Sequence, residues 1–475
     1  MRPMSFFVIR SLFLLAGLAV GAAASDTWYI RPDGGSAAQC DGKTDAPYPG
    51  EGTAQPCAFK NPFFLWTNDL PPTVAAETPT WKISGGDTVL IRQGDYRMGW
   101  KAPNSANTSW WNYSGCRGNN RACSNPPIPP GTEEQPTRIV GEGWNAGCPA
   151  KPILRGAGAV SAVLDLRNTN HVDLECLEIT DNDQCRVATM TGEPYGCLNY
   201  TTDHAYWALQ TNEATHHLLL RNLFIHGMAS AGIVGNIGGD VAVENVHLRG
   251  NGNFGWNFDP GSQRPSKGPL SLSKVTIEWS ACVERLPLAD PVILACYDQD
   301  GANANGDALG FVDLDGDLTI DQSIIRFNQQ DGLDALYVKS ARTLKVTNSQ
   351  FYGNNGQQIK TGGAADTIIQ NNLVIGNCER QTEGVAGVTA EGYNKFEKSF
   401  CRGADFMALL FKAGTSMRVE NNTLVTVAPT AFDFQCRRIM DVYNSSGRVA
   451  HDGSVDPTLA TDGVRRSFPT LSPIT

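Results

Sequence analysis

Two short stretches, Leu218-Leu-Leu-Arg-Asn222 and Val241-Ala-Val-Glu-Asn245, show the pattern that decides the fold. Each has apolar residues at positions one and three, a charged residue at position four and Asn at position five. Six further pentapeptides follow the pattern more loosely: Val172-Asp-Leu-Glu-Cys176, Leu270-Ser-Leu-Ser-Lys274, Leu318-Thr-Ile-Asp-Gln322, Leu344-Lys-Val-Thr-Asn348, Thr367-Ile-Ile-Gln-Asn371 and Met417-Arg-Val-Glu-Asn421. Alternation with a period of two predicts strands with one buried face. Asn suits the following turn because it tolerates the left-handed conformation, and stacked Asn side chains can form hydrogen-bonded ladders.

The spacing of these pentapeptides indicates a solenoid. Their fifth positions are separated by 46, 23, 29, 48, 26, 23 and 50 residues, mostly one or two multiples of a 23–26-residue step. A unit of this size must stack on its neighbours to bury its apolar face. We therefore predict an all-β protein, a single-stranded right-handed parallel β-helix of roughly ten or more coils with stapled loop insertions. We expect the long steps to contain coils with weaker strands, for example around Trp207 and Leu409.

Other β architectures account less well for the repeat. An antiparallel sandwich also has many short strands, but it gives no reason for a recurring step across half the chain. The Leu spacing is wrong for a leucine-rich repeat. The stretch Gly85–Tyr96 is typical of the first coil of extracellular β-helix proteins, and we expect it to open the solenoid.

The N-terminus has the pattern of a signal peptide. Arg2 and Arg10 lie around an apolar run, Leu12 to Val20, and small residues precede a predicted cleavage site between Ala24 and Ser25. The run is short for a membrane anchor. We therefore expect residues 1–24 to be a signal peptide, the protein to be secreted or periplasmic, and no membrane span to remain after cleavage.

We expect one domain in the mature chain. Residues 25–436 would form the β-helix, with a loop insertion at about 102–134, and residues 437–475 a C-terminal cap or tail. The 13 cysteines fit an oxidising compartment. Cysteines close in sequence are interpreted as local disulfides, in the pairs Cys40 and Cys57, Cys116 and Cys123, Cys185 and Cys197, Cys282 and Cys296, and Cys378 and Cys401. Cys148, Cys176 and Cys436 have no assigned partner.

Charge and histidine content limit the partners. A net charge of −10 argues against nucleic acid, whose phosphates need clustered Lys and Arg. His216 and His217 begin a strand with no metal-ligating partner at a useful spacing, so we expect them to be structural. We expect the protein to be a monomer.

The residues best suited to bind a metal ion or to transfer a proton lie in three successive coils. Asp307 and Asp334 are 27 residues apart, and Asp334 and Gln357 are 23 apart, each close to one coil. Neighbouring coils lie about 4.8 Å apart. Asp307, Asp331 and Asp334 should therefore converge on one outer patch, with Lys360 on the next coil. Three adjacent carboxylates repel one another unless a cation neutralises them, and oxygen ligands favour Ca²⁺ over Zn²⁺.

These segments resemble polysaccharide lyase family 9, within the pectate lyase-like β-helix superfamily. The similar motifs are Asn305-Gly-Asp307-Ala-Leu-Gly-Phe311, Gln330-Asp331-Gly-Leu-Asp334 and Asn355-Gly-Gln-Gln-Ile-Lys360-Thr-Gly-Gly363. The resemblance implies that Asp307, Asp331 and Asp334 are metal ligands for Ca²⁺ and that Lys360 is the catalytic base. The chain departs from the family where Gln330 replaces the first Asp of the middle motif, where two residues follow Asp307 as an insertion, and where Gln-Gln-Ile precedes the Lys.

The resemblance implies a calcium-dependent lyase that cleaves an acidic uronate polysaccharide, such as pectate, by β-elimination. Such an enzyme removes the weakly acidic C5 proton of a uronate while a cation balances the charge on its carboxylate. Lys339 is a rival base without a counterpart in the family motif. Two other functions remain open: a glycoside hydrolase that uses Asp331 and Asp334 without a metal, and a non-catalytic β-helix that binds glycan at a surface.

Overall fold

The computed structural model describes residues 25–65, 81–99, 125–158, 160–181, 204–258, 265–284, 292–296, 306–311, 313–335, 338, 341–376, 388–391, 405–411, 415–426, 438–444 and 447–448. The predicted signal peptide and most of the 102–134 insertion lie outside these residues. Within them, no helix has the length and apolar character needed to cross a membrane.

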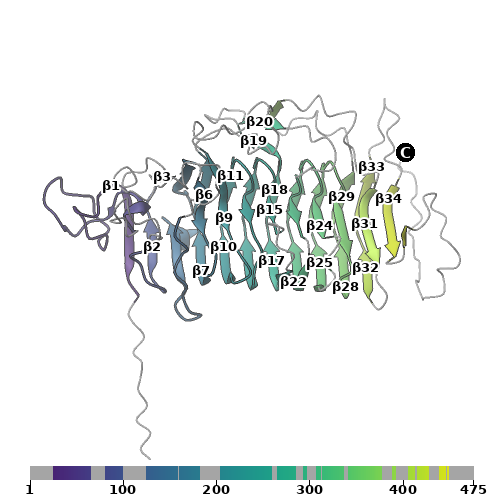
Figure 1. Ribbon diagram of the computed structural model, residues 1–475. Helices are drawn as coiled ribbons and strands as arrows, with labels where there is room; N and C mark the ends of the chain where they lie inside the picture. The colour runs from purple at the N-terminus through teal and green to yellow at the C-terminus, as the bar shows by residue number, and fades with distance from the viewer. Residues whose placement is uncertain are drawn as a thin grey trace, which may run out of the picture.

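The described chain winds through three long sheets that run side by side along one axis (Figure 1). The first sheet has the order β1 (Thr27–Gly35), β2 (Thr88–Ile91), β4 (Thr137–Gly141), β7 (Asn170–Glu175), β10 (His216–Arg221), β13 (Gly239–Glu244), β17 (Leu270–Ser273), β22 (Leu314–Asp321), β25 (Ala341–Thr347), β28 (Asp366–Gln370) and β32 (Ser416–Glu420); β16 (Ser266–Lys267) also pairs with β22.

The second sheet contains β3 (Asp95–Gly99), β5 (Ile153–Ala157), β8 (Glu178–Asp181), β11 (Phe224–His226), β14 (His247–Arg249), β18 (Thr276–Glu278), β23 (Ile324–Arg326), β26 (Gln350–Tyr352), β29 (Leu373–Gly376) and β33 (Thr423–Thr426). The third contains β6 (Val160–Asp165), β9 (Ala205–Gln210), β12 (Ile233–Val234), β15 (Trp256–Asn257), β21 (Leu309–Gly310), β24 (Leu333–Ala335), β27 (Ile359–Gly362), β31 (Asp405–Phe411), β34 (Arg438–Asn444) and β35 (Gly447–Arg448). In the described part of the chain, the short 3-10 helices η1 (Pro62–Leu65) and η3 (Trp144–Ala146) lie outside the sheets.

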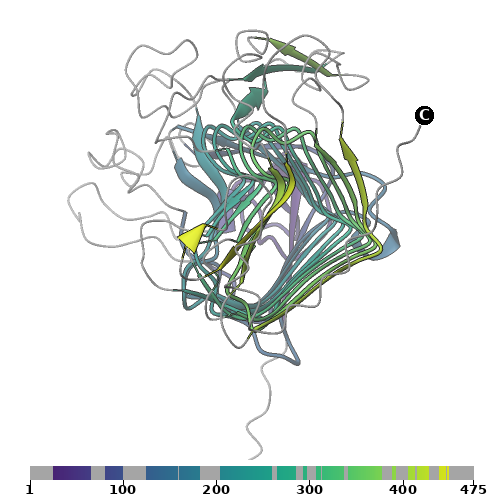
Figure 2. The same ribbon diagram turned by 90° about the vertical axis from the view of Figure 1, so that its right-hand side faces the viewer.

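Each full coil contributes one strand to each sheet, as β13, β14 and β15 do, and Figure 2 shows the coils superposed along the axis. The first positions of the eight pentapeptides are Cα partners in one continuous ladder: Val172, Leu218, Val241, Leu270, Leu318, Leu344, Thr367 and Met417. Their fifth positions all have left-handed backbone, with φ between 49° and 59°. The predicted strands and the predicted turn conformation are confirmed.

The prediction of hidden coils in the long steps is wrong. Val172 pairs directly with Leu218 although 46 residues separate them, and Leu270 pairs directly with Leu318. The extra length lies between the second-sheet and third-sheet strands of single coils. Trp207 accordingly lies in β9, the third-sheet strand of the coil that begins with β7.

The core lies inside the three sheets. Side chains from successive third-sheet strands, including Leu209, Ile233, Leu309 and Leu333, are fully buried, and each such side chain contributes about 1.5–3 kcal/mol through burial. Ladders of polar side chains follow the turns: Asn245 Nδ2 donates to Asn222 Oδ1 at 2.7 Å. Stacking of identical turns therefore stabilises the solenoid beyond the core itself.

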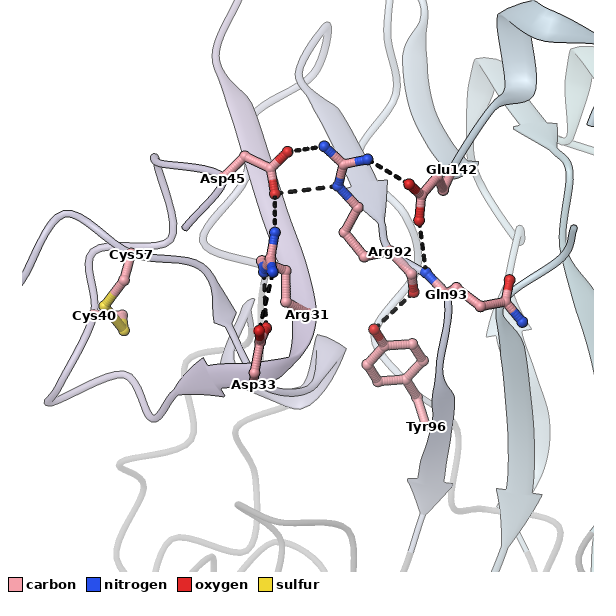
Figure 3. A network of polar contacts seen from close by, with 9 residues as sticks. All are labelled: Arg31, Asp33, Cys40, Asp45, Cys57, Arg92, Gln93, Tyr96 and Glu142. Carbon is pink, nitrogen blue, oxygen red and sulfur yellow. Dashed lines mark hydrogen bonds and ion pairs between the residues drawn. A yellow bond between two sulfur atoms is a disulfide. The ribbon is translucent and has the colours of Figure 1, made fainter. Parts of the chain in front are cut away.

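An ion-pair network joins residues 25–65 to the coils that follow (Figure 3). Arg31 bonds Asp33 and Asp45, while Arg92 of the loop after β2 bonds Asp45 and Glu142, next to β4. Hydrogen bonds from Arg92 hold the pKa of the Asp45 carboxyl below its ordinary value despite partial burial. The N-terminal segment is thus anchored by charges from three successive strands.

The disulfides agree in part with the sequence interpretation. Cys40 pairs with Cys57 as predicted, and two of the unassigned cysteines, Cys148 and Cys176, pair with each other. Cys282 is disulfide-bonded and is the Cα partner of Cys296 in an antiparallel ladder. The remaining cysteines, Cys116, Cys123, Cys185, Cys197, Cys378, Cys401 and Cys436, lie outside the described residues. Both complete bridges fit folding in an oxidising compartment.

Candidate active site

Three successive third-sheet strands bring the four predicted site residues together. Asp334 of β24 is the Cα partner of Lys360 in β27 and of Gly310 in β21. Asp307 and Asp331 precede β21 and β24, at the corner where the chain enters the third sheet. Carboxylate oxygens of Asp307, Asp331 and Asp334 lie within 4.8 Å of one another. The convergence expected from the coil spacing is therefore present.

Backbone amides of neighbouring coils orient two of the carboxylates. The N–H of Asp331 donates to Asp307 Oδ1 at 2.9 Å, and the N–H of Gln357 donates to Asp331 Oδ1 at 2.7 Å. A Cβ at Gly356 would lie 2.0 Å from Asp331 Oδ1, so only glycine leaves room for this carboxylate. The glycine of the third motif therefore has a steric role in the site.

The Lys360 ammonium lies among the carboxylates. Nζ contacts Asp331 Oδ2 and lies 3.3 Å from Asp334 Oδ2. Asp307 and Asp331 are buried, whereas the Asp334 and Lys360 side chains are 25% and 21% exposed. The cluster therefore opens to solvent on the side of Asp334 and Lys360.

Burial and the neighbouring charges shift the pKa values of Asp307, Asp331 and Lys360. Desolvation, followed by repulsion from Asp331 and Asp334, raises the pKa of Asp307 well above its ordinary value. Desolvation also raises the pKa of Asp331 to about 6, although the Lys360 ammonium opposes the shift. Burial lowers the pKa of Lys360, but the carboxylates outweigh it and raise that pKa overall. Among the described residues, one ammonium contacts this cluster of three carboxylates, and additional positive charge would stabilise their ionised forms.

The donor set fits a calcium ion. Three carboxylates on adjacent coils supply only oxygen, which is the ligand that Ca²⁺ prefers. Gln330, which departs from the family motif, immediately precedes Asp331 and has its backbone hydrogen-bonded to both neighbouring coils, at Gly306 and Gly356. These backbone hydrogen bonds hold the position next to Asp331 without help from the Gln330 side chain. Asn305 and the rival base Lys339 lie outside the described residues.

Next to the carboxylate cluster, Gly310 leaves a space that a side chain would otherwise fill. A methyl group at this position would lie 3.4 Å from Asp307 Oδ2 and 3.9 Å from Phe254 Cε1. Phe254 is half-buried and packs against a small apolar cluster of Tyr206, Trp207, Ala231 and Val234. An aromatic ring and a carboxylate thus face the same space above Gly310.

Two long insertions meet next to the site. β19 (Cys282–Glu284) and β20 (Val292–Cys296) belong to the coil that leads to Asp307, and β30 (Val388–Glu391) belongs to the coil after Lys360. β20 and β30 pair in parallel, so the two insertions are joined across the intervening coils (Figure 1). These insertions account for two of the long steps in the repeat.

A buried charge cluster that the sequence analysis missed holds the base of the first insertion. Glu284 contacts Arg249 of β14 and lies 2.5 Å from His226 Nδ1 of β11, while His226 Nε2 lies 3.1 Å from Glu178 Oε1 of β8. Burial lowers the pKa of His226, but the two glutamates outweigh it and raise the pKa overall. His226 and Glu284 are 58 residues apart, and no local motif connects them.

Comparison with protein-family models agrees with the architecture. The family described as "Right handed beta helix region" matches residues 302–446, which include the site. No curated protein matches the sequence. Similar solved structures include a rhamnogalacturonan lyase, with a TM-score of 0.37 and 12% identity, covering 74% of this chain and 82% of that chain. Another is pectate lyase Pel9A, with a TM-score of 0.33 and 12% identity, covering 95% of this chain and 89% of that chain. The strand pairing and the family match together identify the chain as a right-handed parallel β-helix protein.

Proposed function

We propose that this protein is a secreted, calcium-dependent polysaccharide lyase that cleaves an acidic, uronate-containing glycan by β-elimination. The observation that carries the proposal is the convergence of Asp307, Asp331, Asp334 and Lys360 from three successive coils. This cluster combines three carboxylates, which are hard oxygen ligands, with one amine that contacts them. The match of these residues to the lyase motifs in the sequence supports the assignment.

Asp307, Asp331 and Asp334 would hold the calcium ion. When bound, Ca²⁺ supplies positive charge that neutralises the uronate carboxylate and makes the neighbouring C5 proton more acidic. The backbone N–H groups of Asp331 and Gln357 fix two of the ligands before substrate arrives, so little reorganisation is needed.

Lys360 would take the C5 proton. As an ammonium held by Asp331 and Asp334 it has no lone pair to accept one, so the carboxylates that raise its pKa keep it inactive. Added positive charge at the cluster lowers that pKa and favours the neutral amine. Activity should therefore depend on calcium and increase toward alkaline pH.

The space above Gly310 would receive a sugar ring next to the scissile bond. Phe254 offers an aromatic face or edge there, and aromatic side chains bind the apolar faces of sugars. The nearest carboxylate is Asp307. The sugar ring would then lie beside the calcium ligands, and Gly310 would place no side chain in its way.

A glycoside hydrolase is the second candidate, and the perturbed carboxyl groups favour it. Asp307 and Asp331 both have raised pKa values, and a carboxylic acid protonated near neutral pH can serve as a general acid. Asp334 would then be the second carboxyl group of the pair. Hydrolysis creates a new reducing end without an unsaturated product and needs no calcium.

The distinguishing experiment uses the protein from about Ser25 onward with polygalacturonate, alginate and glycosaminoglycans. Absorbance of the conjugated C4–C5 double bond and release of reducing ends are followed in parallel, with Ca²⁺ or with chelator. Both signals together, abolished by chelator, support the lyase. Reducing ends without absorbance support the hydrolase, and binding of a glycan without either signal supports a non-catalytic surface protein.

A further inference from the structure

Three buried carboxamides, which we call the amide ladder, lie at the corner where the second sheet passes into the third: Asn328, Asn354 and Gln358. Asn328 follows β23, whereas Asn354 and Gln358 lie between β26 and β27. The three residues are 0%, 4% and 2% exposed. Buried amide groups are costly unless they are hydrogen-bonded, so their partners show what the ladder holds in place.

Each member of the amide ladder bonds to the next. The backbone N–H of Ser280 donates to Asn328 Oδ1 at 3.0 Å. Asn328 Nδ2 donates to Asn354 Oδ1 at 2.8 Å, and Asn354 Nδ2 donates to Gln358 Oε1 at 2.7 Å. The ladder therefore connects three successive coils, beginning with the coil from which the first insertion leaves.

The last amide of the ladder closes the turn that carries the third motif. Gln358 Nε2 donates to the carbonyl oxygen of Asn354 at 2.9 Å, and Gln358 Oε1 also accepts the backbone N–H of Asn354 at 3.2 Å. Gln357 lies within this turn, and its N–H donates to Asp331 Oδ1 at 2.7 Å. The Gln358 side chain thus fixes the turn whose backbone orients the Asp331 carboxylate.

We propose that Gln358 and Asn354 are positioning residues for the calcium site and act through the Gln357 N–H on the Asp331 carboxylate. This inference rests on the proposed function. Removal of the Gln358 amide would leave the buried Asn354 Nδ2 and N–H groups without this acceptor, so the turn must rearrange to satisfy them. A displaced turn would carry the Gln357 N–H away from Asp331, and groups that orient a metal ligand contribute to metal affinity.

A second ladder of buried amides supplies a matched control, because it lies at the corner between the first and second sheets. Asn372 Oδ1 accepts the N–H of Ser349 at 2.9 Å, and Asn372 Nδ2 donates to Asn422 Oδ1 at 3.0 Å. Asn372 is 2% exposed, as is Gln358. Loss of this carboxamide therefore tests the effect on stability of removing the same chemical group at the same burial.

Calcium calorimetry of the protein from about Ser25 onward compares Gln358→Met with Asn372→Leu. Each substitution replaces a buried carboxamide with an apolar side chain of similar size, and the unbranched Met adapts to the space that Gln358 leaves. Unfolding temperatures are measured in parallel, and binding is measured well below them. Gln358→Asn keeps a carboxamide but shortens its reach, and it serves if Gln358→Met folds poorly.

We expect calcium affinity to fall about tenfold or more in Gln358→Met, to fall less in Gln358→Asn, and to stay unchanged in Asn372→Leu. Both Gln358→Met and Asn372→Leu should lower the unfolding temperature. The activity of Gln358→Met on polygalacturonate should recover as calcium is raised, with KM for the glycan unchanged at saturating calcium.

Equal calcium affinity in the native protein and both Gln358 variants would overturn the positioning role and leave the lyase assignment standing. An equal loss of affinity in Gln358→Met and Asn372→Leu would also overturn it, because a general loss of stability would then account for both. Absence of calcium binding by the native protein would reject this inference together with the calcium dependence of the proposed function.

Discussion

Lys360 Nζ lies 3.3 Å from Asp334 Oδ2, and the two residues are direct Cα partners on the neighbouring strands β27 and β24. The ammonium also contacts Asp331. The proposed base is therefore held by two of the proposed calcium ligands. This relationship makes calcium binding and the protonation of Lys360 interdependent, because both cations compete for the same carboxylates.

Replacement of Lys360 by Ala should abolish proton abstraction and leave calcium binding in place. Turnover should fall to background because the amine that contacts Asp331 and Asp334 is gone. Calcium should bind at least as tightly as in the native protein, because the competing ammonium is gone. Product absorbance and calcium calorimetry measure the two effects. Lys345→Ala, which removes an exposed lysine of the first-sheet strand β25, is the control. Full activity in Lys360→Ala would reject this residue as the base.

Calcium affinity should decrease as the pH falls through about 6. Burial raises the pKa of Asp331 to about 6, so protons compete with calcium for this ligand at a higher pH than at an ordinary aspartate. The pKa of Asp307 is also raised. Calorimetry between about pH 5 and 8 should show this dependence. In Asp331→Asn the affinity should be weak throughout and its dependence on pH reduced; an unchanged profile would remove Asp331 from the ligand set.

Gly356→Ala should damage the site although the substitution removes no charged side chain. Its Cβ would lie 2.0 Å from Asp331 Oδ1, so the carboxylate or the turn must move. We expect calcium affinity and turnover to fall by about tenfold or more. Gly310→Ala is the matched control for calcium binding, since its methyl group would lie 3.4 Å from Asp307 Oδ2, an ordinary contact. Similar calcium affinities in the two variants would contradict the steric argument.

Phe254→Ala should weaken substrate binding and leave calcium binding intact. If the contact between the ring and the sugar contributes as much as a contact between two aromatic rings, about 0.5–1.5 kcal/mol, its loss raises KM about threefold to tenfold. The value of kcat should change less. Phe254→Tyr keeps the ring and serves as the control. If KM is unchanged in Phe254→Ala, the sugar ring does not lie above Gly310.

Glu284→Gln should destabilise the protein in a manner that depends on pH. Breaking a buried pair costs about 3–5 kcal/mol. Burial raises the pKa of Glu284, but His226 and Arg249 outweigh it and lower the pKa overall, whereas the pKa of His226 is raised. The Glu284 contribution is present above the carboxyl's ordinary pKa and is lost as the pH falls through its lowered value. The His226 contribution is present below the ordinary imidazole pKa and is lost as the pH rises through the raised value.

The loss of unfolding temperature in Glu284→Gln should therefore be largest near pH 6 and smaller above the folded-state pKa of His226. Glu244→Gln, which affects an exposed pair with Arg221, should show a small loss that varies little over this range. A loss in Glu284→Gln that is constant from acid to alkaline pH would show that His226 is not charged in the folded protein.

The sequence predicts those features that repeat from coil to coil. The pentapeptides predict the ladder from Val172 to Met417 and the left-handed turns, because each coil must present the same apolar positions inward. The same regularity brings Asp307, Asp334 and Lys360 together, since 24 or 26 residues complete a coil without an insertion in this part of the chain.

Features that depend on insertions or corners do not follow from the repeat. The step from Val172 to Leu218 is one coil with a long excursion, and its length happens to be twice that of the short step. The stacking of His171 on His217 depends on left-handed backbone at unpaired positions, which residue type alone does not indicate for histidine. The contact between Glu284 and His226 depends on where an insertion folds back.

The most direct test of the central claim is ultraviolet absorbance over time for the protein mixed with polygalacturonate at alkaline pH, with Ca²⁺ or with chelator. A lyase leaves a double bond conjugated to the uronate carboxylate. We predict a rise in absorbance with Ca²⁺ that chelator stops and that Lys360→Ala lacks. A rise that persists in Lys360→Ala, or no rise with polygalacturonate, alginate and glycosaminoglycans alike, would contradict it.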